Sequence, residues 1–150
     1  MIELFSRRIK GVTLPPDAIL TPFPVEDDIS SLSAILLDSG YYDFLKSGVM
    51  ILDGIPILDA QHLIPFKAKA WLDLSARKAK GEQIDSKVIR KHKNDVFKLY
   101  SVLPVNLAIA LPEIVKADML AFISANIAEN TAELLRIAEY YRIKDDLLLI

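Results

Sequence analysis

Eight prolines divide this chain into stretches that can be helical and stretches that cannot. Four of them lie between Pro15 and Pro24, and proline lacks an amide hydrogen and also restricts the residue before it. We therefore expect residues 15–24 to form an extended connector without helix. Pro104 and Pro112 bracket a second break, and helices are expected on either side of it.

The first 48 residues are predicted to contain one short strand and two short helices. Residues 1–9 alternate apolar and polar side chains in part, as a strand does. Asp27 or Asp28 can cap a helix that runs through Ile29, Leu32, Ile35 and Leu36, and residues 38–40 are expected to break it. A second helix over residues 41–46 should end before Gly48.

Residues 49–58 have the pattern of a β-hairpin. Two apolar runs flank Asp53-Gly54, a pair that readily adopts the positive φ angles of a type I′ turn. Pro56 cannot donate to a strand ladder, so the second strand is expected at a sheet edge.

The remainder of the chain is predicted to be helical. We expect helices over residues 65–80, 86–102, 113–126 and 131–142, with Pro65 in a first turn and Gly81 at a helix end. The predicted fold class is α+β and predominantly α: a short N-terminal strand and a hairpin, followed by about four to five helices. We expect one domain over 1–150, with a strand and hairpin part at 1–60 and a helical part at 61–150.

Composition excludes several classes of protein. A chain of 150 residues with 52% apolar residues is long and apolar enough for a globular core. The absence of cysteine excludes disulfide scaffolds, thiolate zinc sites and cysteine nucleophiles. No segment has the pattern of a secretory signal or a membrane span, so a cytoplasmic protein without membrane contact is expected. The mean hydropathy of +0.29 is high for a chain with this many charges, which suggests either a core larger than usual for this length or an apolar surface that a partner covers.

Charge is concentrated in the middle of the chain. Residues 67–98 carry ten basic and four acidic residues, a net charge of +6, whereas the rest of the chain carries −8. Such a window suggests an anionic ligand, such as phosphate or nucleic acid, but charge alone favours two helices whose lysine-rich faces are solvated.

Lys67 is the first candidate functional residue. On a helical projection it falls among apolar residues, where an ammonium group must reach water, pair or meet a ligand. Asp95 lies at the margin of the apolar face of the next helix, and the short connection at residues 81–85 predicts antiparallel packing that brings the two together. The pair is open to two interpretations, a phosphate-binding lysine with an orienting aspartate or a structural ion pair. His92 is interpreted as a core histidine.

Several motifs are absent. The five glycines form neither a P-loop nor a dinucleotide-binding fingerprint, and no G-x-S-x-G is present. No metal-ligand spacing can be identified, so no metal-binding residues are predicted.

Two segments resemble a known family. Residues 62–73 and 91–99 resemble the C-terminal half of bacterial nucleotidyltransferase-fold proteins, which include the toxins of abortive-infection toxin–antitoxin pairs. The resemblance implies that Lys67 binds a nucleoside triphosphate and that Lys93 assists it. It also implies that Asp95 orients the site and that Glu3, in Ile2-Glu3-Leu4, is a third carboxylate.

The same resemblance implies an incomplete catalytic site. The family uses a Gly-Ser turn and an Asp-x-Asp pair that holds magnesium, and neither occurs in this sequence. We therefore expect a family member or remnant that is inactive alone, with magnesium and a nucleoside triphosphate relevant only if another chain supplies the missing half.

Two other functions remain open at this point. One is a non-catalytic interaction module of a toxin–antitoxin-like system, with an antitoxin as the partner. The other, weaker hypothesis is RNA binding through the basic window. The high hydropathy further predicts a homo-oligomer, formed at an open strand edge near residues 2–5.

Overall fold

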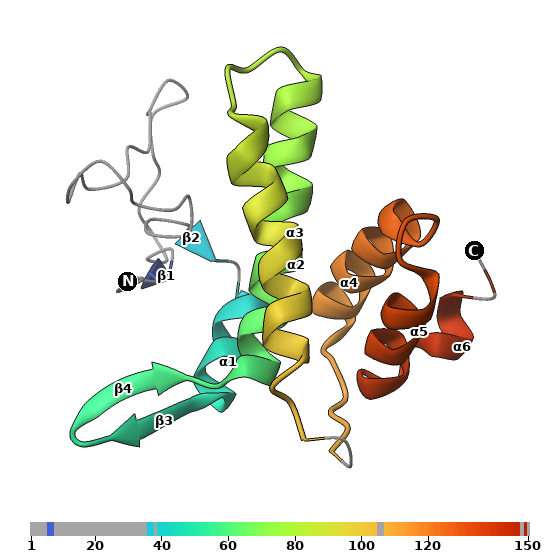
Figure 1. Cartoon of the computed structure of the whole chain (residues 1–150). Helices are drawn as coiled ribbons and strands as arrows, with labels where there is room; N and C mark the ends of the chain where they lie inside the picture. Colours follow the sequence, from blue (N-terminus) through green and yellow to red (C-terminus); the bar gives the residue numbers. More distant parts are fainter. Residues whose placement is uncertain (1–5, 8–35, 38, 105–106, 148, 150) are drawn as a thin grey trace.

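The computed structural model describes residues 6–7, 36–37, 39–104, 107–147 and 149. Helices dominate these residues, and the strands all lie before residue 60, which confirms the α+β, predominantly α class (Figure 1). The elements are β1 (Ser6–Arg7), β2 (Leu36–Leu37), α1 (Ser39–Ser47), β3 (Val49–Leu52), β4 (Ile55–Leu58), α2 (Ala60–Ala79), α3 (Ser86–Tyr100), α4 (Glu113–Asn126), α5 (Thr131–Tyr140) and α6 (Lys144–Leu147).

Three boundaries differ from the sequence-based expectation. Leu36 lies in β2, which pairs in parallel with β1, and not in a helix. Ser39 and Gly40 begin α1 where a break was expected. Near the C-terminus, α6 follows α5 as a further short helix. The helix expected before Leu36 and most of the N-terminal strand, with the connector, lie outside the described residues.

Helix α2 begins five residues earlier than expected, so that Pro65 lies inside it. Proline in a helix leaves the carbonyl four residues earlier, here that of Gln61, without its usual donor. The Tyr141 hydroxyl donates to this carbonyl at 2.6 Å. A contact from beyond α5 thus satisfies the group that Pro65 leaves unpaired, and the helix continues back to its N-cap Asp59, whose carboxylate accepts from the His62 amide at 2.8 Å.

The core lies where the helices meet. In Figure 1, α2 and α3 stand as a long antiparallel pair, with α4, α5 and α6 beside them. One buried cluster joins α2 and α3 to α4 and α5, and a second joins α1 to α2 and α4. The first includes Ile64, Val96, Phe122 and Leu134, and the second consists of Tyr41, Phe44, Phe66 and Val115.

The predicted hairpin is confirmed and projects from the helices (Figure 1). Asp53 and Gly54 have φ angles of 51° and 78°, as a type I′ turn requires. Among the described residues no helix combines the length and the apolar character that crossing a membrane requires.

Candidate functional site

The two predicted helices with the candidate residues pack antiparallel, as expected. Gly81, with a φ of 94°, follows the end of α2, and Asp85 caps α3 by accepting from the Lys87 amide at 2.8 Å. This reversal brings Lys67 and Asp95 together, with Nζ and Oδ2 3.5 Å apart. Lys67 is only 7% exposed, so the ammonium lies inside the helix interface as its position among apolar residues predicted.

Lys93 does not join this pair. Residues two positions apart on an α-helix are rotated by about 200° about its axis. Lys93 and Asp95 therefore lie on opposite flanks of α3. The Lys93 ammonium instead contacts the Glu129 carboxylate, which follows α4, at 2.5 Å. The four residues that the family resemblance assigned to one site are therefore not all together: Lys67 and Asp95 form a pair, Lys93 lies elsewhere, and Glu3 is outside the described residues.

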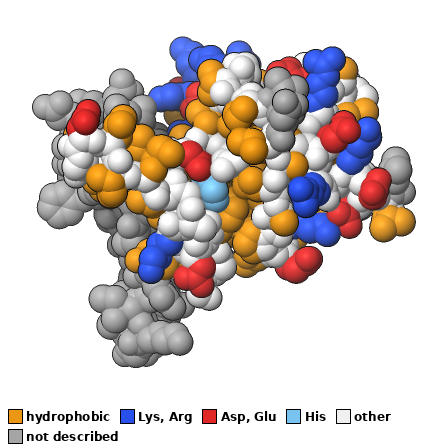
Figure 2. Space-filling model, turned by 90° about the horizontal axis from the view of Figure 1, so that it is seen from below, with side chains coloured by type: hydrophobic (Ala, Val, Ile, Leu, Met, Phe, Trp, Pro, Cys, Tyr) orange, Lys and Arg blue, Asp and Glu red, His pale blue; other side chains and the backbone are white. Residues whose placement is uncertain are grey.

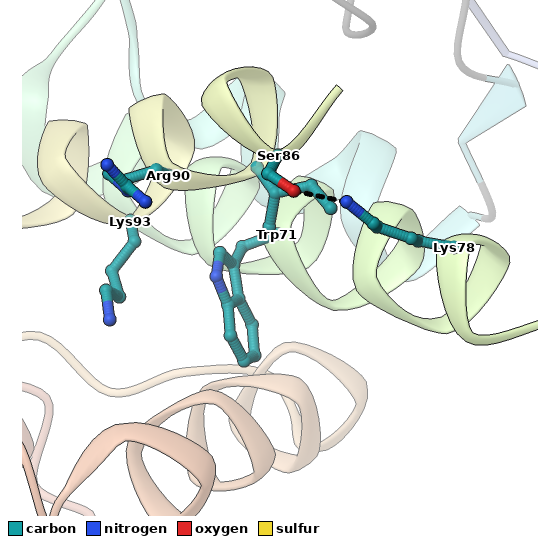
Figure 3. Close-up of a pocket in the computed structure, with 6 residues that line it drawn as sticks. Trp71, Lys78, Ser86, Arg90 and Lys93 are labelled. Carbon is teal, nitrogen blue, oxygen red and sulfur yellow. Dashed lines mark hydrogen bonds between the residues drawn. The ribbon is translucent and has the colours of Figure 1, made fainter. Parts of the chain in front are cut away.

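Lys93 lines an open pocket of about 240 Å³ on its own flank of the α2–α3 pair (Figure 3). Figure 3 shows the Trp71 and Lys93 side chains extending in the same direction, toward the C-terminal helices. The Trp71 ring meets Phe122 of α4 edge to face, with centroids 5.4 Å apart, which fixes the indole at the pocket wall. The lining residues are Trp71, Lys78, Ser86, Ile89, Arg90 and Lys93.

The pocket is strongly cationic. Three of its lining residues are basic, and Lys78 donates to the Ser86 hydroxyl across the gap between the two helices. One of the three cations, Lys93, pairs with the Glu129 carboxylate. An indole, an isoleucine and three cations around one opening suit an anion with an apolar or aromatic part.

Sequence reasoning did not identify this pocket. Trp71 is only partly buried. A signal was present: Trp71 and Lys78 are seven positions apart on one helix, and Ser86, Arg90 and Lys93 follow at spacings of three and four on the next. Because these two sets of residues lie on different helices, no pattern within one helix connects them.

Ser47, His62 and Asp59 are arranged like a catalytic triad at the junction of α1 and α2. The His62 Nδ1 lies 2.7 Å from Asp59, and its Nε2 lies 3.1 Å from the Ser47 hydroxyl. The single hydroxyl hydrogen of Ser47, however, is directed to the Phe44 carbonyl at 2.6 Å. A nucleophilic serine must give this hydrogen to its histidine, so the arrangement joins the two helices rather than activating Ser47.

A second polar group joins three helices. The Asp118 carboxylate accepts from the Tyr41 hydroxyl at 2.7 Å and from the Lys69 ammonium at 3.2 Å. Lys69 of α2 thereby pairs with α4. Burial raises the pKa of the nearby Asp73, and the negative charge of Asp118 adds to this, while Lys69 opposes it. This network is best explained as a structural link between α1, α2 and α4.

The described residues do not fit the magnesium ion that the family resemblance implies. Among them, no group of three or more acidic or histidine side chains is placed so that it could hold a metal ion, and the carboxylate of Asp95 already faces the Lys67 ammonium. A divalent ion that holds phosphates needs oxygen ligands in greater number.

The hairpin carries most of the exposed large apolar side chains among the described residues. Ile51, Leu52 and Ile55 are among them, and Ile51 is 67% exposed. Seen from below in Figure 2, hydrophobic side chains gather over this projection at the left of the molecule. Both faces of the hairpin are apolar, so neither face has the polar side chains that solvent-facing strands normally carry.

The comparisons with known proteins add no relative. No family model matches the chain, and neither curated proteins nor solved structures give a match.

Proposed function

We propose that the chain is a nucleotidyltransferase-like protein in which Lys67 binds the phosphates of a nucleoside triphosphate and Asp95 orients the lysine. The observation that carries the proposal is the position of Lys67, an ammonium within an apolar helix interface and 3.5 Å from Asp95. The resemblance of residues 62–73 and 91–99 supports the same two residues.

The physical argument rests on the cost of burying charge. An ammonium removed from water needs an anion nearby, and a carboxylate keeps it charged and oriented while no ligand is bound. A triphosphate carries more negative charge than one carboxylate and competes for the same ammonium. Asp95 would then position Lys67, and Lys67 would contact the ligand.

The chain by itself is not expected to transfer nucleotides. Transfer requires carboxylates that hold magnesium and a turn that holds the phosphates, and the sequence lacks the Gly-Ser and Asp-x-Asp motifs for both. The proposal therefore concerns binding, with catalysis dependent on a partner chain that supplies those groups.

Calorimetric titration of the whole chain with ATP and magnesium tests this proposal. Lys67→Met keeps most of the packing volume and removes the charge, and we expect at least about tenfold weaker binding because one charge-assisted contact is lost. Lys98→Met, on the exposed face of α3, is the matched control and should bind as the unmodified chain does. An unmodified chain that does not bind, or a Lys67→Met variant with full affinity, excludes the role of Lys67.

The hairpin favours a second candidate function, protein interaction with another copy of this chain. Two isolated strands are only marginally stable in water, and pairing with a second hairpin would provide a four-stranded sheet. Each strand is uncharged, so two copies do not repel along their length.

Sedimentation velocity over a range of concentrations tests this second function. We expect Ile51→Lys to shift the chain toward monomer. Val102→Lys, which introduces the same charge at a residue 70% exposed but outside the hairpin, should leave association unchanged. A monomer at all concentrations, or an equal effect of both variants, would contradict this second function.

A further inference from the structure

We propose that the pocket between α2 and α3 binds one nucleotide unit, with the base against Trp71 and the phosphate near Arg90 and Lys93. Neither Lys67 nor Asp95 lines this pocket, and Lys93 and Asp95 lie on opposite flanks of α3. The inference therefore does not depend on the function proposed for Lys67.

The chemistry of the lining matches a nucleotide better than a simple anion. An aromatic ring offers a stacking surface for any base, and guanidinium and ammonium groups bind phosphate oxygens. Trp71 provides the ring from α2, while Arg90 and Lys93 provide the charges from α3, three positions apart on one face. Inorganic phosphate would use only the charges and would make no use of the indole.

The size of the pocket limits the ligand. At about 240 Å³ it is smaller than the roughly 300 Å³ at which pockets begin to enclose a whole drug-sized molecule. One base with its phosphate can lie in such an opening, with the rest of the ligand in solvent. This favours a single nucleotide or one nucleotide of a flexible strand over a fully enclosed triphosphate.

Glu129 provides an internal competitor for the phosphate. Its carboxylate contacts the Lys93 ammonium at 2.5 Å, while its own side chain is 66% exposed. A ligand phosphate must displace this carboxylate to reach Lys93. Glu129→Gln is therefore expected to strengthen binding by up to about fivefold, the upper range for an exposed ion pair.

Trp71 is the only tryptophan in the chain, so its fluorescence reports directly on the pocket. We would titrate the whole chain with uridine monophosphate, with a short oligouridylate and with inorganic phosphate. Stacking of a base on Trp71 should quench the emission for the first two ligands and not for phosphate alone. A strand should show the steeper dependence on salt, which distinguishes a strand site from a free-nucleotide site.

Variants on one helix provide the controls. Arg90→Gln and Lys93→Gln should each weaken binding about tenfold, whereas Lys91→Gln, exposed on the same helix but outside the pocket, should not. Thermal melts of each variant check that it folds. Glu129→Gln is the complementary test, because it should strengthen binding rather than weaken it. The proposal is overturned if neither uridine ligand quenches Trp71, if phosphate alone quenches equally, or if Lys91→Gln weakens binding as much as Arg90→Gln.

Discussion

Gly48 lies so close to His62 that a side chain cannot be added there. A Cβ at this position would overlap the imidazole ring, which Asp59 and Ser47 hold from its two nitrogens. Because the ring also packs against Phe44, it has little room to move. Gly48→Ala is expected to lower the free energy of unfolding by about 1–3 kcal/mol, as overpacking does, measured by urea denaturation.

The control for this prediction is a double-mutant cycle with His62→Ala. If the overlap with the ring causes the loss, Gly48→Ala should cost much less in the His62→Ala background, because the two changes are coupled. Additive effects would show that the backbone of Gly48, and not its contact with the ring, is responsible.

Tyr141 makes the fold sensitive to alkali. Burial raises the pKa of its hydroxyl well above the ordinary value, and the nearby Tyr140 and Asp59 add to the rise. Because the folded pKa is raised, stability is unaffected below the unfolded value of about 10 and is lost as the pH rises above it. We expect the free energy of unfolding to fall by about 1 kcal/mol per pH unit in this range, measured by urea denaturation at a series of alkaline pH values.

Tyr141→Phe removes this titration. The slope of the unfolding free energy against alkaline pH should then decrease by the contribution of one proton, although the variant also loses a hydrogen bond at neutral pH. Phenolate absorbance should show one slowly exposed tyrosine fewer in the variant than in the unmodified chain. An unchanged slope in Tyr141→Phe would assign the alkaline sensitivity to Tyr100 and Tyr140, whose pKa values burial also raises.

At the scale of single residues, periodicity predicted more than the family motif did. The positions of Lys67 and Asp95 followed from apolar spacing and a short connection, and the structure confirms that they meet. Lys93 was assigned to the same site from the family resemblance. A rotation of about 200° about the helix axis separates it from Asp95, however, which argues against a shared site. Its contact with Glu129 involves residues far apart in sequence, which a helical projection cannot show.

At the scale of elements, the start of α2 shows how a tertiary contact changes a local rule. Pro65 was expected to lie in the first turn of the helix. Instead, the Tyr141 hydroxyl donates to the Gln61 carbonyl in place of the amide hydrogen that proline lacks, and the helix begins earlier. Tyr140 also donates to the Gln61 side chain at 2.9 Å. Two tyrosines from the end of α5 thus hold the first turns of α2, and no pattern within α2 itself indicates this.

This explanation predicts a coupling between Pro65 and Tyr141. In the unmodified chain, Tyr141→Phe leaves a buried carbonyl without its donor and should cost about 1–3 kcal/mol. In a Pro65→Ala background the helix supplies an amide hydrogen to Gln61, so the same change should cost about 1 kcal/mol less. Urea denaturation of the four chains measures the coupling, and a value near zero would contradict the role given to Tyr141.

The elements that the sequence predicted best are those with local signals. The hairpin turn, the N-cap Asp85 and the start of α4 after Pro112 all depend on residues within a few positions of each other. In contrast, β2 forms where apolar spacing suggested a helix, because Leu36 and Leu37 pair with Ser6 and Arg7, about thirty residues earlier in the chain. Such pairing depends on contacts that no short window contains.

At the scale of the whole molecule, the hairpin has one edge that can pair and one that cannot. The Asp59 amide donates to the Gly48 carbonyl at 3.2 Å, which makes these residues a hydrogen-bonded pair at the base of the ladder. Because such pairs alternate along an antiparallel ladder, Ile51 and Pro56 form a non-hydrogen-bonded pair, and their backbone nitrogens face outward. The outer edge of β4 therefore lacks a donor at Pro56, while that of β3 has the amides of Val49 and Ile51.

Charge is consistent with a second copy at the β3 edge. If two β3 strands pair antiparallel about Met50, each Val49 lies opposite the other chain's Ile51, and both can exchange hydrogen bonds. Strand β3 carries no charged residue, so like charges do not face each other along the shared edge.

Two proline variants test which edge pairs. Ile51→Pro removes an outward amide and no hydrogen bond within the hairpin, so it should abolish self-association while circular dichroism stays unchanged. Pro56→Ala gives β4 an outward donor and should strengthen self-association, because both edges can then pair. Sedimentation velocity measures both effects. Association that persists in Ile51→Pro would place the contact between copies away from β3, and the exposed apolar side chains of the hairpin would then require a different partner.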